Sequence, residues 1–209
     1  MSSKVPQASH MAWIDLETAD LPTTVGQTYD FSGVHIMEIG LIVTDNALNI
    51  WDKNGFVAGY QACVKMNNDM ANALRANEIT RAMHSENGLI RDCVASTQTL
   101  AEIDTEIDEM LSEVGIPRGM FAIAGSGVAA FDHPAIKVLM PKLASWLAYY
   151  PYDWGVFRRC IASAAGRYVV NPQLESYGET KLHRAMGDVT AHLREAQAYR
   201  DWVRANTPG

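Results

Sequence analysis

The chain has 209 residues, of which 48% are apolar, and a formal net charge of −7 at pH 7. This composition is enough to bury one hydrophobic core, so residues 11–209 are expected to form a single domain behind a polar tail, residues 1–10. No apolar run is long enough to span a bilayer, and the tail lacks the apolar segment of a signal peptide. The acidic balance argues against a broad basic surface for duplex DNA or long RNA.

The cysteines point to a reducing compartment. Cys63, Cys93 and Cys160 are odd in number and far apart, and no pair has Cys-x-x-Cys spacing. They are therefore expected to be reduced thiols in a cytoplasmic protein, and a zinc site is not expected.

The N-terminal half shows a strand-rich pattern that changes to helices. Strands are predicted at Ala12–Leu16, His35–Thr44 and Val57–Val64, where apolar residues dominate. The segment between the first two, residues 19–34, contains proline and glycine and is predicted to be a loop. Helical spacing follows over residues 68–82, with a second short helix around residues 86–95.

The C-terminal half alternates helices and short strands. A helix is predicted over Thr99–Val114, a strand at Met120–Gly125 and a helix over Asp132–Leu147, with Pro134 tolerated in its first turn. A last strand at Tyr149–Trp154 leads into a helix through residue 165, and His183–Ala205 is predicted to be one amphipathic helix. The fold class is therefore α/β.

Two carboxylates stand out in the first predicted strand. Asp15 and Glu17 are two residues apart, so they project from one face while Ile14 and Leu16 project from the other. Like charges this close repel each other unless cations intervene, which favours metal binding over two solvent-facing residues of an edge strand.

Three later residues complete the candidate site, and each has an alternative interpretation. Asp132 begins a predicted helix, and the alternative interpretation is that it caps this helix. His183 and Asp188 lie five residues apart at the entrance of the last helix; His183 alone would be an ordinary surface residue, and Asp188 could pair with His192. Four carboxylates and one histidine are the side chains that hold two divalent metals and one general base for phosphodiester hydrolysis.

This motif set resembles the histidine subtype of the DEDD 3′–5′ exonucleases, and within it the oligoribonucleases. The similar segments are Trp13–Glu17, Ile36–Asp45, His84–Ile90 and Met140–Leu143, together with the spacing of His183 and Asp188. The resemblance implies a ribonuclease H-like exonuclease fold, a mixed five-stranded sheet flanked by helices. It further implies a homodimer in which the fifth-strand region of one subunit meets the other subunit's active site. The aromatic residues expected at that interface are Trp146, Tyr149, Tyr150, Tyr152 and Trp154, which could alternatively fill the core of the monomer.

The resemblance also assigns roles. Asp15, Glu17 and Asp188 would hold one Mg²⁺ or Mn²⁺, with Asp15 shared by a second ion that Asp132 supports, and His183 would be the general base. The implied substrate is short single-stranded RNA, cleaved from its 3′ end to nucleoside 5′-monophosphates. The residues expected to contact that substrate are Leu21, His84 and Ser126.

Departures from the family pattern concern substrate length. The usual Gly-Asn-Ser segment is Gly125–Gly127 here, and an arginine and a serine that bind a substrate's 5′ phosphate correspond to Tyr150 and Gly155. The clusters Arg158–Arg159 and Lys181 with Arg184 could form a local basic patch.

Two alternatives to the oligoribonuclease function remain: a single-stranded DNA 3′–5′ exonuclease, or a non-catalytic nucleic-acid-binding module on the same fold.

Overall fold

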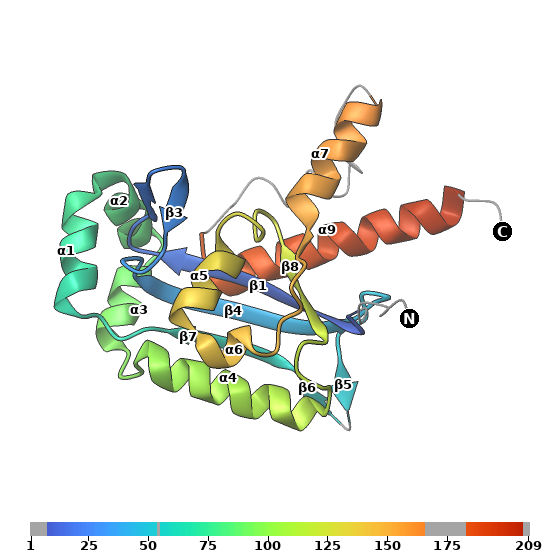
Figure 1. Cartoon of the computed structure of the whole chain (residues 1–209), viewed down its shortest axis with the longest axis horizontal. Coiled ribbons are helices and arrows are strands. Elements are labelled where there is room, and N and C mark those ends of the chain that lie inside the picture. Colours follow the sequence, from blue (N-terminus) through green and yellow to red (C-terminus); the bar gives the residue numbers. More distant parts are fainter. Residues whose placement is uncertain (1–7, 54, 166–182, 207–209) are drawn as a thin grey trace.

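A mixed five-stranded sheet forms the centre of the molecule (Figure 1). In this computed structural model, residues 8–53, 55–165 and 183–206 are described. The strand order is β7-β4-β1-β8-β9; β4 is antiparallel to β1 and β7, whereas β8 is parallel to β1 and β9. The predicted mixed sheet is thus confirmed. The strands are β1 (His10–Thr18), β4 (Ile36–Asp45), β7 (Gly59–Cys63), β8 (Phe121–Gly125) and β9 (Tyr152–Asp153).

Helices cover both faces of the sheet. Helix α9 crosses the face opposite α4, α5 and α6, and α1, α2 and α3 lie together at one end (Figure 1). Within the part of the chain that the structure describes, no helix is long and apolar enough to cross a membrane. The helices are α1 (Asn68–Ala76), α2 (Glu78–Glu86), α3 (Leu89–Ala95), α4 (Leu100–Val114), α5 (Asp132–Leu139), α6 (Pro141–Ala144), α7 (Trp154–Ala165) and α9 (Ala185–Asn206).

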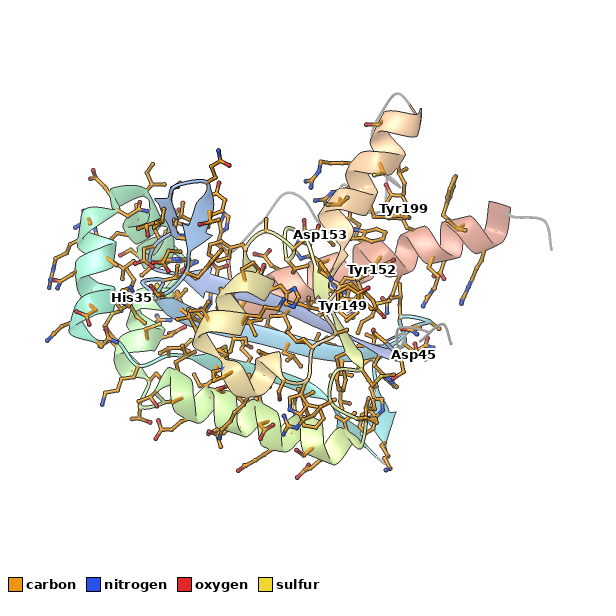
Figure 2. All side chains as sticks on the ribbon, in the orientation of Figure 1. His35, Asp45, Tyr149, Tyr152, Asp153 and Tyr199 are labelled. Carbon is orange, nitrogen blue, oxygen red and sulfur yellow. The ribbon has the colours of Figure 1, made fainter. Side chains whose placement is uncertain are left out.

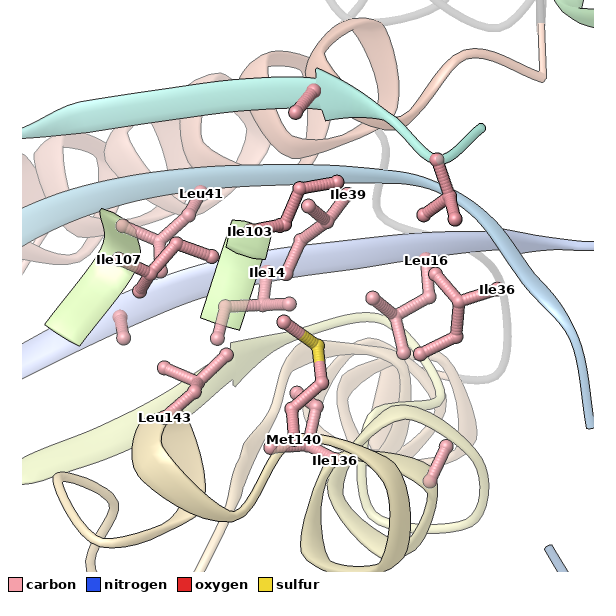
Figure 3. Close-up of a cluster of buried hydrophobic side chains, with 14 of the residues drawn as sticks. Ile14, Leu16, Ile36, Ile39, Leu41, Ile103, Ile107, Ile136, Met140 and Leu143 are labelled. Atoms are coloured by element: carbon pink, nitrogen blue, oxygen red, sulfur yellow. The ribbon is translucent and has the colours of Figure 1, made fainter. Parts of the chain in front are cut away.

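The alternation of β1 divides the buried apolar side chains between two clusters. Ile14 and Leu16 pack with Ile103 and Ile107 of α4 in the larger cluster (Figure 3). Trp13, one residue away, faces the opposite side and packs with apolar residues of α9. Because side chains alternate along a strand, the odd-numbered positions of β1, including its two acidic residues, face the α9 side.

Several predicted elements differ in extent from those observed; the last strand, predicted at Tyr149–Trp154, is limited to β9, because α7 already begins at Trp154. The predicted helix over Asp132–Leu147 breaks at Met140, because Pro141 has no backbone N–H and disfavours helical geometry in the residue before it. The helix predicted over residues 68–82 is divided at Asn77, whose side chain accepts from the Thr80 amide and starts α2.

The expected loop over residues 19–34 contains a small hairpin, β2 (Thr23–Val25) and β3 (Thr28–Asp30). Gly26 occupies the turn with a φ of +64°, a conformation that favours glycine. Threonine, valine and tyrosine are strand-forming residues, which explains why this polar segment pairs. A second hairpin joins β5 (Asp52–Lys53) to β6 (Phe56–Val57).

Candidate active site

The candidate site lies where the C-terminal end of β1 meets the start of α9. Gly40 of β4 makes that approach possible, since a Cβ there would lie 2.7 Å from backbone atoms of Ala185 and Met186. With glycine at this position, the first turn of α9 rests directly on the sheet. His183 and Asp188 are thereby brought beside the acidic face of β1.

Glu17, His183 and Asp188 form a compact group of potential metal ligands. One ligand atom from each lies within 4.8 Å of the others. Glu17 is buried, whereas His183 and Asp188 are only partly covered. Asp15 is half-buried one pleat before Glu17 and on the same face of β1. The structure therefore brings together residues that are more than 160 positions apart in the sequence.

The electrostatics of this group favour a bound cation. Burial raises the pKa of Glu17 to about 8, and the nearby carboxylates of Asp188, Glu38 and Asp132 add to the rise against the opposing charge of Arg184. Oxygen ligands of this density, with one imidazole, suit hard divalent ions such as Mg²⁺ and Mn²⁺. The residues present thus fit the divalent metals that the motif set implies.

Asp132 is fixed to the same end of β1 from the opposite side. It is the first residue of α5, and its Oδ1 accepts a hydrogen bond of 3.0 Å from the Leu16 amide. The helix-capping alternative is not borne out, because Phe131 holds the N-cap position and no side chain caps this helix. Burial raises the pKa of Asp132 to about 7, and Asp153 adds to the effect.

The residues expected to contact substrate have different surroundings. Leu21 follows β1 and is 71% exposed, as a side chain that packs on a base must be. His84 lies beside the group, with Nε2 4.0 Å from a Glu17 oxygen and 3.1 Å from the Thr18 carbonyl. Its ring is only 1% exposed, so base stacking on His84, which stays a prediction, requires that neighbouring groups uncover it.

Two arginines of the predicted basic clusters are ion-paired within the protein. Arg158 pairs with Glu195 at 2.9 Å and donates to the Ser126 hydroxyl at 3.2 Å. Arg184 pairs with Glu38, while Lys181 lies outside the described residues. Arg158 and Arg184 are therefore engaged in contacts within the protein, and a local basic patch that includes Arg159 or Lys181 stays a prediction.

The aromatic residues near the fifth strand divide between core and surface. Trp146 and Trp154 are buried within the monomer, as the alternative interpretation proposed. Tyr149 is 71% exposed, and Tyr152 and Asp153 form β9, directly before α7 (Figure 2). The Asp153 carboxylate accepts from the amides of Gly127 and Ala129 and so fixes the loop that precedes Asp132.

Sequence reasoning missed Glu38 and its partner Arg184. The sequence did contain an indication of Glu38, which is the only charged residue in the apolar run Ile36–Val43. A carboxylate in a fully buried strand requires a partner. The identity of that partner was not predictable, because Arg184 lies 146 residues further along the chain.

Comparison with known proteins agrees with this arrangement. No family model matches the chain. It is 28% identical over 193 residues to an oligoribonuclease of Haemophilus influenzae, covering 92% of this chain and 93% of that protein. It is also 28% identical over 194 residues to a probable oligoribonuclease of Caenorhabditis elegans, covering 91% and 87%, respectively. These relatives confirm the resemblance to oligoribonucleases.

Solved structures extend the comparison to the fold. The zinc-bound complex of E. coli exonuclease I with single-stranded DNA superposes with a TM-score of 0.61 at 16% identity. The match covers 94% of this chain and 41% of exonuclease I, so the chain spans about two-fifths of that protein's length. The predicted exonuclease fold is thereby confirmed.

Proposed function

We propose that the chain is a divalent-metal-dependent 3′–5′ exoribonuclease that degrades short single-stranded oligoribonucleotides to nucleoside 5′-monophosphates. The observation that carries this proposal is the grouping of Glu17, His183 and Asp188 within 4.8 Å. It occurs in a chain that matches an oligoribonuclease over 92% of its length. The net charge of −7 supports short substrates, because a long basic track is not needed to hold them.

Each residue of the site has a proposed role. Asp15, Glu17 and Asp188 would hold one metal ion, and Asp132, together with Asp15, a second. When bound, the metals would polarise the phosphodiester and lower the pKa of the attacking water. The His183 imidazole would accept the proton of that water, because imidazole is the side chain best suited to proton transfer near neutral pH.

Residues outside the carboxylate group would hold the substrate. Leu21, exposed after β1, would pack against a terminal base, and His84 would stack on the next base once uncovered. Ser126 would contact the substrate from the loop before α5; its hydroxyl accepts from Arg158 in the free protein. Truncation of Leu21 to alanine should raise KM more than it lowers kcat, which tests this assignment.

A ladder of end-labelled RNA and DNA oligomers, two to ten nucleotides long, tests the activity in Mg²⁺ and in Mn²⁺. RNA should be shortened from its 3′ end with release of nucleoside 5′-monophosphates, and Asp188→Asn should abolish the reaction. Glu109→Asn provides the control, because it removes a carboxylate from an exposed position of α4, outside the candidate site. Absence of cleavage by the folded native protein in both metals would refute the proposal.

A DNA exonuclease is the second candidate. It is favoured by the fold similarity to exonuclease I in complex with single-stranded DNA, which covers 94% of this chain. DNA oligomers in the same ladder decide between the two sugars. The non-catalytic binding module is disfavoured, because nucleic-acid binding alone gives no reason to crowd carboxylates around a buried glutamate.

We also propose that the protein forms a homodimer through the region around Tyr149. Its 71% exposed ring supports this, because exposed aromatic side chains are enriched at interfaces. Light scattering at micromolar concentration should give twice the mass of the 23.0 kDa chain. A monomeric mass would contradict the dimer, and Tyr149→Ser should weaken it.

A further inference from the structure

Glu38 is a fifth acidic residue beside the site, and its surroundings differ from those of the other four. It lies directly opposite Glu17 in the register of β4 and β1, and it is completely buried. Its Oε1 accepts from Gln61 at 2.8 Å and from Arg184 Nη2 at 2.9 Å. Its Oε2 accepts from Arg184 Nε and from the Ala185 amide, both at 3.0 Å.

These four hydrogen bonds occupy the acceptor capacity of the Glu38 carboxylate. The bonds to Arg184 are a bidentate pair, the geometry that makes arginine–carboxylate contacts strong and directional. Glu38 is therefore engaged with the start of α9 and is not available as a metal ligand in this arrangement. Its neighbour across the strands, Glu17, belongs to the metal-ligand group instead.

Arg184 connects this carboxylate to the catalytic motif. Its Nη1 donates to Asp92 of α3 at 2.9 Å, so the guanidinium joins β4 to α3 while its backbone lies between His183 and α9. The His183 carbonyl accepts from the Asn87 side chain at 2.6 Å. The segment 183–185 is thus held at both sides by side chains of other elements.

The backbone of His183 needs such support. Its φ of +45° is uncommon for a residue with a side chain and persists where the surroundings fix it. A side chain that must meet the reacting groups tolerates little displacement, because misplacement by about 1 Å can cost on the order of 100-fold in rate.

We infer that Glu38 and Arg184 are positioning residues: their buried ion pair fixes His183 and the first turn of α9, and through it Asp188, against the acidic face of β1. The inference rests on the proposed function for the chemistry that it serves. It assigns neither residue to substrate or metal. A substrate-binding role for Arg184 and a metal-binding role for Glu38 are the alternatives that the experiment must separate.

The test compares Arg184→Lys and Glu38→Gln with native protein. Lysine keeps the charge but cannot form the bidentate contact and reach Asp92 together. The matched control is Arg75→Lys, since Arg75 is exposed on α1 and donates to Asn72 in its own helix. Binding of Mn²⁺ to the protein alone is measured from free-ion electron paramagnetic resonance, and kcat and KM are measured on a short oligoribonucleotide.

Both site variants should bind Mn²⁺ about 10- to 100-fold more weakly and lose kcat by a similar factor, the range for residues that orient metal ligands. KM should change little, because neither residue touches substrate, and Arg75→Lys should match native protein throughout. Circular dichroism spectra confirm the fold of each variant, and Glu38→Gln, which retains shape and polarity, covers the case in which Arg184→Lys does not fold.

Native Mn²⁺ affinity and kcat in a folded Arg184→Lys protein would overturn the inference. So would a rise in KM with unchanged kcat, which would place Arg184 at the substrate. If native protein cleaves no oligonucleotide, the proposed function fails, and the Mn²⁺ titration still decides whether the ion pair positions the ligand group.

Discussion

Replacing Glu17 by glutamine should stabilise the metal-free protein at alkaline pH. Burial and the carboxylates of Asp188, Glu38 and Asp132 raise the pKa of Glu17 to about 8 from an ordinary 4.5. The folded protein therefore retains a proton that the unfolded chain loses above pH 4.5, so stability falls as pH rises from 4.5 to about 8. Each pKa unit corresponds to about 1.36 kcal/mol, which sets a ceiling of about 5 kcal/mol on this loss.

Glutamine has nearly the same shape as glutamate and does not ionise. The stability of the variant should therefore not show this fall between pH 4.5 and pH 8. Urea denaturation in the presence of a chelator, followed by tryptophan fluorescence at pH 5 and pH 8, measures the difference. At pH 5 the two proteins should be nearly equal, and at pH 8 Glu17→Gln should be more stable. Addition of Mg²⁺ should stabilise native protein more than the variant, since the metal would bind the ionised carboxylate.

Glu38 lies opposite Glu17 in the pairing of β1 with β4, and Glu38→Gln provides a control in which the stability at alkaline pH should change in the opposite direction. Burial alone would raise the pKa of Glu38, but hydrogen bonds from Arg184, Gln61 and the Ala185 amide lower it below its ordinary value. Its contribution to stability is present above pH 4.5, so Glu38→Gln should destabilise the protein at pH 8. Equal or lower stability of Glu17→Gln than of native protein at pH 8 would refute the reasoning.

Three further predictions concern activity. His183→Ala should lower kcat about 10²–10⁴-fold, the range for general-base catalysis, with Mn²⁺ still bound; a few-fold loss would favour another base. Gly40→Ala should destabilise the fold by about 1–3 kcal/mol and slow cleavage, because the added Cβ would lie 2.7 Å from the backbone at the start of α9. Gly33→Ala is the control: the space around Gly33 is open, so neither stability nor cleavage should change. Measured kcat/KM for a 5′-phosphorylated dinucleotide and a heptamer should differ less than about 100-fold, or about 2.7 kcal/mol. The reason is that the family resemblance places Tyr150 and Gly155 where an arginine and a serine would bind the 5′ phosphate; a larger dinucleotide preference would contradict this.

Much of the sheet was predictable because its signals are local. The run from Ala12 to Leu16 has the apolar content of a buried strand, and its alternation separates Ile14 and Leu16 from the two acidic residues. Thr99 with Glu102 forms the capping box that starts α4. The shorter helices were less predictable, since Asn77 ends one helix and starts the next within a continuous helical pattern.

The spatial grouping of the site depended on non-local information. The spacing of His183 and Asp188 indicated a motif, but their approach to β1 requires Gly40, whose small size matters only once α9 lies on the sheet. The ion pair of Glu38 with Arg184 likewise exists only in the folded chain. Such contacts between distant segments leave no periodic pattern in the sequence, which is why family resemblance was needed to connect the motifs.

The two glutamates that face each other across β1 and β4 illustrate how the fold assigns charge. Hydrogen bonds from Arg184, from Gln61 and from the Ala185 amide lower the pKa of Glu38. Burial and the neighbouring carboxylates instead raise the pKa of Glu17. Arg184 is located on the same segment as His183, so its ion pair with Glu38 also ties the segment of the proposed general base to β4. The residues proposed to hold metal therefore remain closely spaced carboxylates, where divalent ions would offset both those residues and the substrate phosphate. Under the proposed function, this division of charge would let an acidic protein bind a polyanion locally without a basic surface.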